Sequence, residues 1–227
     1  AVRLAAVLED AGLNDVAAVG RYCWAVGERG VVCDSGDGGE TWRTRALPFD
    51  CRLTSVCFLT NRRGWIAGIR SGADGSGRGV LLATEDGGET WQVPGAAELS
   101  LPGILQLQFF GSDEAIAVTL PAAEHQGATL FRTVDGGVVW EPLRSDRADA
   151  VWLAAGFNGV DEGVLGGFRQ GLGVLTSSES VVLQQAQRGL RSLRAVSLGV
   201  DKSGWAAGDG GTILRTMDSG VSWSAPT

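Results

Sequence analysis

The sequence predicts an all-β fold, a β-propeller of about five four-stranded antiparallel blades. Three observations support this prediction. An eight-residue phrase ending in tryptophan occurs four times, short runs of alternating apolar and polar residues precede each copy, and the units average about 45 residues over a chain of 227. Alternation with a period of two is typical of half-buried strands. A four-strand unit repeated at this period is typical of a propeller blade.

The repeated phrase reads Ser/Thr-x-Asp-x-Gly-x-x-Trp. Its aspartates and tryptophans are Asp37 and Trp42, Asp86 and Trp91, Asp135 and Trp140, and Asp218 and Trp223. We expect each copy to form a tight turn in which Ser/Thr and Asp side chains bond backbone N–H groups, a glycine takes a positive φ, and the tryptophan packs beneath. Because the aspartates recur at one place in every unit, we interpret them as structural rather than catalytic.

The repeat divides the chain into units that together make one domain, residues 1–227. Each unit is expected to hold an alternating first strand, a glycine-rich second strand, a short apolar third strand, the aspartate turn, and a fourth strand that begins at the tryptophan. The fourth unit is worn, with Ser178 at the aspartate position and Leu183 at the tryptophan position. Residues 1–11 are expected to close the ring by pairing one end of the chain with the other. The expected units are 12–50, 51–100, 101–148, 149–190 and 191–227.

These motifs carry a family resemblance. The Asp-Gly-Gly-x-Thr-Trp turns resemble Asp-boxes, the repeat of sialidases and other Asp-box propellers. The run Gly-Trp-Ala-Ala-Gly, Gly-Thr-Ile-Leu-Arg-Thr and Asp-Ser-Gly-Val-Ser-Trp over residues 204–223 is more similar to the photosystem II stability/assembly factor family. That family usually has seven blades, whereas this chain shows five units. The resemblance implies an assembly factor or accessory subunit that docks on the extracytoplasmic face of a photosynthetic, reaction-centre type membrane complex.

Composition narrows the partners and the compartment. A net charge of −7 argues against nucleic acid, because phosphate binding requires a positive surface. No apolar run of 18 residues is present, so no transmembrane helix is expected. We therefore expect a periplasmic or other extracytoplasmic protein that reaches the membrane through protein subunits of a complex, and we expect no cofactor.

The four cysteines lie in the first quarter of the chain. Cys23 and Cys33 fall near opposite positions of one expected hairpin, which makes them a candidate disulfide and would suit an oxidising compartment. Cys51 and Cys57 are a second candidate pair, and four small buried apolar residues are an equally good interpretation. No C-x-x-C occurs and the chain has one histidine, so a metal site is not expected.

The chain offers little from which to build a catalytic site, and we predict that it is not an enzyme. Tyr22 is the single tyrosine, placed too early to match a sialidase nucleophile, and His125 is the single histidine. The alternative function is a carbohydrate-binding or vestigial sialidase/glycosidase-like propeller. Trp152, the one tryptophan outside the repeat positions, is the residue through which that alternative would act.

The connections between second and third strands differ in length. They are two residues long in units one and five, but extended at residues 69–79 and 120–128 of units two and three. Extended loops on adjacent blades and one face favour a contact surface, and tolerance of surface insertions is the alternative. The candidate partner-binding residues on these loops are Arg70, Asp74, Arg78, Glu124 and His125.

Overall fold

A computed structural model describes residues 11–72, 77–95, 99, 101–121, 129–145, 151–168, 171–177, 180–184 and 192–226 of the chain. Within these residues the regular structure is β-strand with short 3-10 turns, so the all-β prediction is confirmed. The predicted closure segment is not described apart from Ala11, which packs against the buried side chains of Ala25, Val31 and Cys33.

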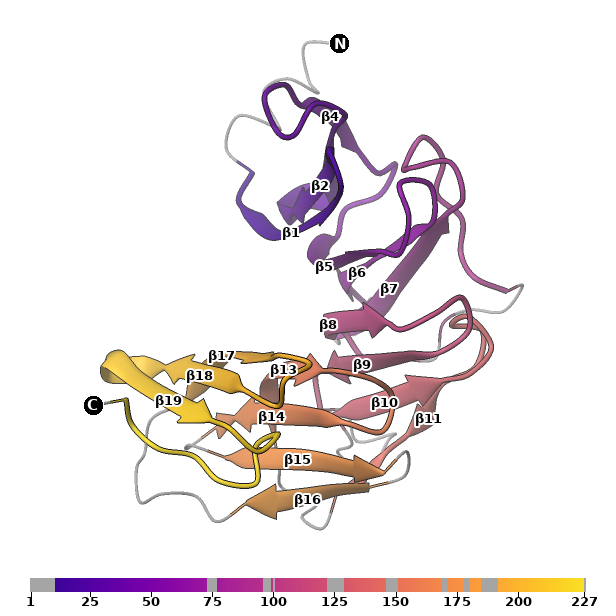
Figure 1. Cartoon of the computed structure of the whole chain (residues 1–227). Coiled ribbons are helices and arrows are strands. Elements are labelled where there is room, and N and C mark those ends of the chain that lie inside the picture. The colour runs from indigo at the N-terminus through magenta and orange to yellow at the C-terminus, as the bar shows by residue number, and fades with distance from the viewer. Residues whose placement is uncertain are drawn as a thin grey trace.

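The strands form five sheets, called blades 1 to 5 here, and neighbours within each sheet follow chain order. Figure 1 shows them one after another along an arc, with blade 1 and blade 5 apart at its two ends. Blade 1 holds β1 (Leu13–Val19), β2 (Tyr22–Gly27), β3 (Val31–Ser35) and β4 (Arg43–Ala46), and blade 2 holds β5 (Arg52–Phe58), β6 (Gly64–Ser71) and β7 (Gly77–Thr84). Blade 3 holds β8 (Ile104–Phe109), β9 (Ala115–Thr119), β10 (Leu130–Thr133) and β11 (Glu141–Pro142). Blade 4 holds β13 (Trp152–Phe157), β14 (Gly163–Gly167), β15 (Leu172–Ser177) and β16 (Ser180–Gln184), and blade 5 holds β17 (Leu193–Leu198), β18 (Gly204–Gly208) and β19 (Thr212–Thr216).

The expected fourth strand is short where it follows an Asp-box. In blade 2 it is reduced to the bridge between Ala83 and Gln92, and in blade 5 to the bridge between Arg215 and Ser224. Blade 4 gains an extra strand instead, because β12 (Arg144–Ser145) runs parallel to β16. The four-strand meander is therefore the common plan, and whether the complete ring holds five blades stays a prediction.

The hydrophobic core lies between successive blades rather than inside any one of them. Trp24 of blade 1 stacks on Phe58 of blade 2 with ring centroids 3.5 Å apart, and Trp65 of blade 2 stacks on Phe109 of blade 3 at 3.7 Å. Both tryptophans are 2% exposed. A strand pairs within its own sheet, but it buries its side chains against the next one, so each blade needs a neighbour on both faces.

The candidate disulfide is not formed. Cys23 lies opposite Ser35 and Cys33 opposite Ala25 in the β2–β3 pair, so the two cysteines are diagonal neighbours. Diagonal Cβ atoms in a sheet lie roughly 7 Å apart, well beyond the reach of a disulfide. Cys51 and Cys57 are also free thiols, with Cys51 buried and Cys57 half-buried.

Candidate partner-binding site

The β6–β7 hairpin extends beyond the edge of blade 2. Its pairing continues through Arg70 opposite Arg78 to Ser71 opposite Gly77, so most of the expected loop 69–79 is strand. Both arginines are exposed. Residues directly opposite in an antiparallel pair project to the same side with their Cβ atoms about 5 Å apart. The hairpin therefore presents two guanidinium groups side by side.

Backbone hydrogen bonds join this hairpin to the start of the second extended loop. The Gly79 N–H donates to the Leu101 carbonyl at 2.9 Å, and the Gly103 N–H donates to the Gly77 carbonyl at 2.9 Å. The Leu120 N–H then donates to the Gly103 carbonyl at 2.8 Å. The two loops predicted to share a surface thus meet through one linking segment. Asp74, Glu124 and His125, the other predicted contact residues, lie outside the described residues.

The base of the hairpin contacts blade 1. The Arg70 guanidinium lies over the Phe49 ring, 5.9 Å from its centroid, which positions the charge without neutralising it. Nearby, burial raises the pKa of the Cys51 thiol to about 11, and Asp50 adds to the rise. Cys51 is therefore a neutral thiol at physiological pH and not an activated nucleophile.

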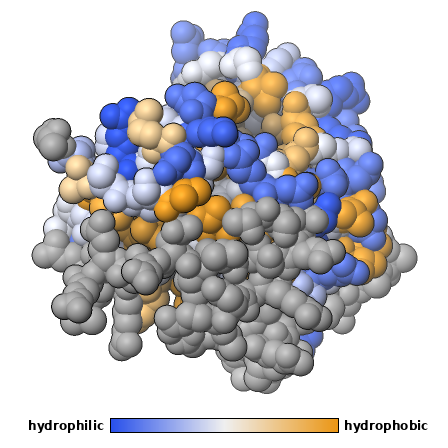
Figure 2. Space-filling view, turned by 60° about the horizontal axis from the view of Figure 1, so that its bottom comes forward, coloured by the Kyte–Doolittle hydropathy of each residue, from blue (hydrophilic) through white to orange (hydrophobic). Residues whose placement is uncertain are grey.

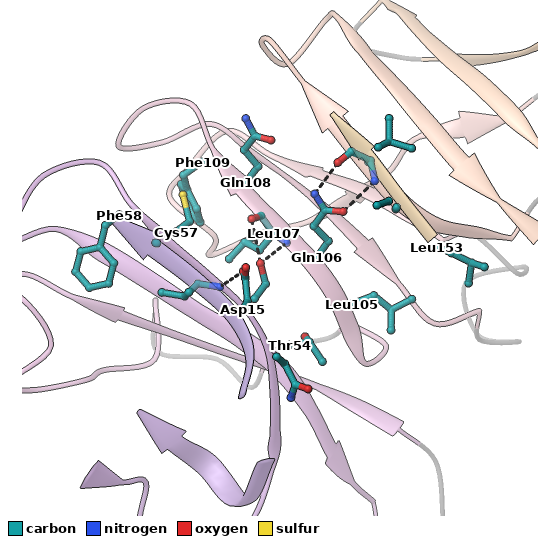
Figure 3. Close-up of a pocket in the computed structure, with 18 of the residues that line it drawn as sticks. Asp15, Thr54, Cys57, Phe58, Leu105, Gln106, Leu107, Gln108, Phe109 and Leu153 are labelled. Atoms are coloured by element: carbon teal, nitrogen blue, oxygen red, sulfur yellow. Dashed lines mark hydrogen bonds between the residues drawn. The ribbon is translucent and has the colours of Figure 1, made fainter. Parts of the chain in front are cut away.

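A central cavity of about 740 Å³ lies among the first strands of the blades, which makes these strands innermost. Figure 3 shows its lining, to which β5 and β8 contribute most of the labelled side chains. Three side chains at one shared strand position accept a backbone N–H from the next blade: Asp15 from Val56 at 2.8 Å, Ser55 from Leu107 at 3.0 Å and Gln106 from Ala155 at 2.9 Å. These bonds satisfy edge groups that strand pairing leaves open.

The cavity carries little reactive chemistry. At the shared position blades 4 and 5 have Ala154 and Ala195, which cannot accept a hydrogen bond. Burial raises the pKa of Cys57, and the Arg194 guanidinium donates to the Asp209 carboxylate at 3.1 Å. Among the described residues no group of three His, Cys, Asp or Glu side chains could hold a metal. The cavity wall is mainly a hydrogen-bonded seam between blades.

The four Asp-boxes share one hydrogen-bond pattern. In the copy of blade 2, the Asp86 carboxylate accepts from the Thr90 N–H at 2.9 Å and from the hydroxyls of Thr90 and Thr84 at 2.6 and 2.8 Å. The Thr84 hydroxyl in turn accepts the Gly88 N–H at 2.9 Å. Gly87 and Gly88 have φ of 81° and 94°, a region that favours glycine. The listed contacts of this carboxylate all lie within the turn.

These bonds lower the pKa of Asp86, with the Thr90 hydroxyl as the largest cause. The pKa of Asp37 is lowered in the same way by Thr41. The pKa of Asp135 is lowered chiefly by the Val139 N–H, and that of Asp218 by the Ser222 hydroxyl. A depressed folded pKa means that the carboxylates stabilise the fold above the ordinary pKa of aspartate, about 3.9, and lose that contribution as the pH falls below it.

We expect Asp86→Ala to lower the melting temperature at pH 7, because the turn loses the acceptor of three hydrogen bonds. The difference from the parent protein should shrink as the pH falls below about 4, where the parent carboxylate also protonates. Thermal melts followed by circular dichroism between pH 7 and pH 3 measure this. Glu85→Ala is the control, since Glu85 makes only an exposed ion pair with Arg63 at 3.2 Å. An Asp86→Ala protein that melts like its parent but no longer binds its partner would contradict the structural role.

Tryptophan exposure separates two kinds of site. Trp152 is 2% exposed and packs with Phe157 and Leu165 in the core between blades 3 and 4. It cannot stack on a sugar, so the feature that suggested a carbohydrate site is a core residue. Exposed rings are found elsewhere among the described residues, at Trp42 and Trp205. On the face shown in Figure 2, apolar residues occur in small groups between hydrophilic ones.

The sequence matches the family model described as photosynthesis system II assembly factor YCF48 over residues 4–151. The chain belongs to this family. The resemblance predicted from the Asp-boxes and the Gly-Trp-x-x-Gly strands is therefore confirmed. No curated protein matches the sequence.

Solved YCF48 structures share the fold. The structure of YCF48 bound to D1 peptide superposes with a TM-score of 0.69 at 24% identity, covering 95% of this chain and 66% of that one. YCF48 from Cyanidioschyzon merolae gives 0.57 at 22% identity, covering 94% and 84%. An ancestral GH74 enzyme gives 0.66 at 16% identity, covering 93% and 30%. These likenesses show the propeller fold, and this chain spans about two thirds of the YCF48 chain solved with the D1 peptide.

Proposed function

We propose that this chain is a non-enzymatic binding scaffold, an assembly factor or accessory subunit that holds a segment of a reaction-centre protein. The observation that carries the proposal is the pairing of Arg70 directly opposite Arg78 on an exposed hairpin. Like charges at opposite positions of a strand pair destabilise the pair. Neither arginine forms an ion pair with another described residue. A carboxylate supplied by a partner would relieve the repulsion through charge-assisted hydrogen bonds.

The family supports a peptide as the ligand. A YCF48 protein has been solved with a D1 peptide bound, and this chain shares its propeller fold. The binding surface we propose for the present chain consists of the β6–β7 hairpin, the linking segment 101–103 and the loop that begins at Leu120. The partner is a protein segment that carries acidic side chains or a terminal carboxylate.

The same proposal places the protein outside the cytoplasm, docked on the photosynthetic complex through its partner. No helix within the described part of the chain is long and apolar enough to cross a membrane, which agrees with docking through a partner. The binding role also explains the neutral thiols and the absence of a metal cluster among the described residues. Cleavage of any member of a glycan panel by the purified protein would overturn the non-enzymatic assignment.

The test is the double variant Arg70→Gln/Arg78→Gln. Charge-assisted hydrogen bonds contribute about 1.5–3 kcal/mol each, so loss of both should weaken binding by roughly tenfold or more. Its melting temperature should stay the same or rise, because the repulsion between the two guanidinium groups is gone. Binding is measured by co-purification with detergent-solubilised photosynthetic membranes, with pigment absorption as the readout.

Arg62→Gln is the matched control. Arg62 donates to the Glu85 carbonyl at 3.3 Å, in the turn that lies against the Asp-box on the opposite face. It removes one charge without touching the hairpin, and co-purification should be unchanged. If the double variant still co-purifies at the parent level, the arginine pair does not bind the partner.

A further inference from the structure

Blade 5 leaves one face of its sheet uncovered. Exposure alternates along its strands, and the side chains that point outward are Ala195, Ser197, Trp205, Ala207, Ile213 and Arg215. The register places Ser197, Trp205 and Arg215 in one row, and Ala195, Ala207 and Ile213 in the next. Trp205 is 45% exposed and Ile213 is 50% exposed. We call these six side chains the free face of blade 5.

The same positions in blade 2 are fully covered. Trp65, Ala67 and Leu81 occupy the sites that Trp205, Ala207 and Ile213 occupy in blade 5, and none of the three is more than 2% exposed. The two sets match closely in shape, because each combines a tryptophan, an alanine and a four-carbon aliphatic side chain. The free face of blade 5 therefore has the composition of a face that is built to be buried.

A tryptophan at this position is covered by the first strand of the next blade. The Phe109 ring stacks on Trp65 with an angle of 8° between the planes, and the Phe58 ring stacks on Trp24 at 6°. The Trp24 indole N–H also donates to the Gly87 carbonyl in the Asp-box of blade 2, at 2.8 Å. Both covered tryptophans thus receive a phenylalanine from the sixth or seventh residue of a first strand.

We propose that the free face of blade 5 binds a further blade of the same repeat type, whose first strand carries a phenylalanine at the position of Phe58 and Phe109. Blade 1 does not supply this ring, either within the molecule or from a second copy. The register gives its first strand Ala18 at that position, and an alanine cannot stack on an indole. Its own outward residues Ala25, Val31 and Cys33 are already buried.

The occupant is therefore polypeptide other than residues 1–227. The structural relatives are large enough to contain such a blade. This chain covers 66% of the YCF48 chain solved with the D1 peptide and 68% of the Doa1 WD40 propeller, so both hold chain beyond the matched part. In the chain itself, the Arg215 guanidinium lies over Trp205, 5.4 Å from the ring centroid, where an arriving ring would displace it.

The experiment extends the full chain with a blade that carries the required ring. A second copy of residues 96–143 is appended after Thr227, which gives Trp223 and the appended Leu101 the spacing that Trp91 and Leu101 have in the parent. Hydroxyl-radical footprinting with mass spectrometry then measures the reactivity of Trp205. We expect at least fivefold protection in the extended protein, roughly the contrast between an exposed and a buried ring, and parent-level reactivity when the appended copy carries Phe109→Ala.

A second extension with residues 47–92, which carries Phe58, guards against a copy that does not fold in its new place. Parent-level labelling of Trp205 in both extensions overturns the proposal. In the unextended monomer, Trp205 should label far more than Trp65, and equal protection of the two would show that the chain covers the face itself. Protection that appears only as the unextended chain self-associates, followed by sedimentation, would assign the face to a second copy and also overturn the proposal.

Discussion

Trp65→Ala is expected to destabilise the protein by about 3–5 kcal/mol, the range for truncating a large buried aromatic side chain. Trp65 is 2% exposed, and its ring lies between the Phe109 ring at 3.7 Å and the Arg63 guanidinium at 5.4 Å. Truncation leaves a cavity between blades 2 and 3 and removes the stacking contact. Urea unfolding followed by circular dichroism, extrapolated to zero denaturant, gives the free energy of unfolding.

Trp205→Ala is the matched control, because it removes the same ring from the same strand position of a uncovered face. Surface substitutions usually change stability by less than about 0.5–1 kcal/mol, and we expect this variant to fall in that range. Equal losses for the two variants would mean that both rings are buried in solution. The comparison therefore measures how much of the stability comes from contact between blades.

Much of the fold could be predicted from the sequence because propeller repeats are local. Each Asp-box places its serine or threonine, aspartate and glycine within five residues, so its hydrogen bonds are visible in the order of residues. Strands such as β18 and β19 show their alternation directly, since one face is exposed. The first strand of blade 4, β13, was not assigned from the sequence. It is buried on both faces and reads as a continuous apolar run.

Contacts between blades could not be predicted in the same way. The Glu89 carboxylate binds Arg43 and Arg45 of blade 1, each at 2.8 Å, across more than 40 residues of sequence. The hydrogen bonds from Asp15, Ser55 and Gln106 to the next blade depend on how close successive first strands lie. Such distances follow from the packing of whole sheets, and no short pattern records them. Sequence alone also left Cys23 and Cys33 ambiguous, since register decides whether they meet.

The candidate site was predicted in part. The sequence located the extended connection 69–79 and its two arginines, because blades 1 and 5 show how short the turn can be. It did not show that Arg70 and Arg78 lie opposite each other, or that the hairpin joins the loop of blade 3 through Gly103. Both features depend on strand register. That register also explains why this hairpin can be removed without breaking the sheet.

Replacement of residues 69–78 by Asp-Gly is expected to abolish association with the membrane complex and leave the fold intact. The change gives blade 2 the turn of blade 5, where Asp209 and Gly210 connect Gly208 to Gly211, and of blade 1, where Glu28 and Arg29 do the same. The bond from the Gly79 N–H to the Leu101 carbonyl should persist. Its counterpart exists in blade 1 behind the short turn, where the Gly30 N–H donates to the Cys51 carbonyl at 2.7 Å.

The excised residues contribute two paired arginines and the Gly77 carbonyl that anchors Gly103, so the cationic surface and its link to the blade 3 loop are lost together. Co-purification with solubilised membranes should fall to background, while the melting temperature stays within a few degrees of the parent. Exchange of Asp209–Gly210 for Glu-Arg is the control, since it is the same kind of turn replacement on a blade away from the hairpin. A folded, excised protein that still co-purifies would place the binding surface on another part of the propeller.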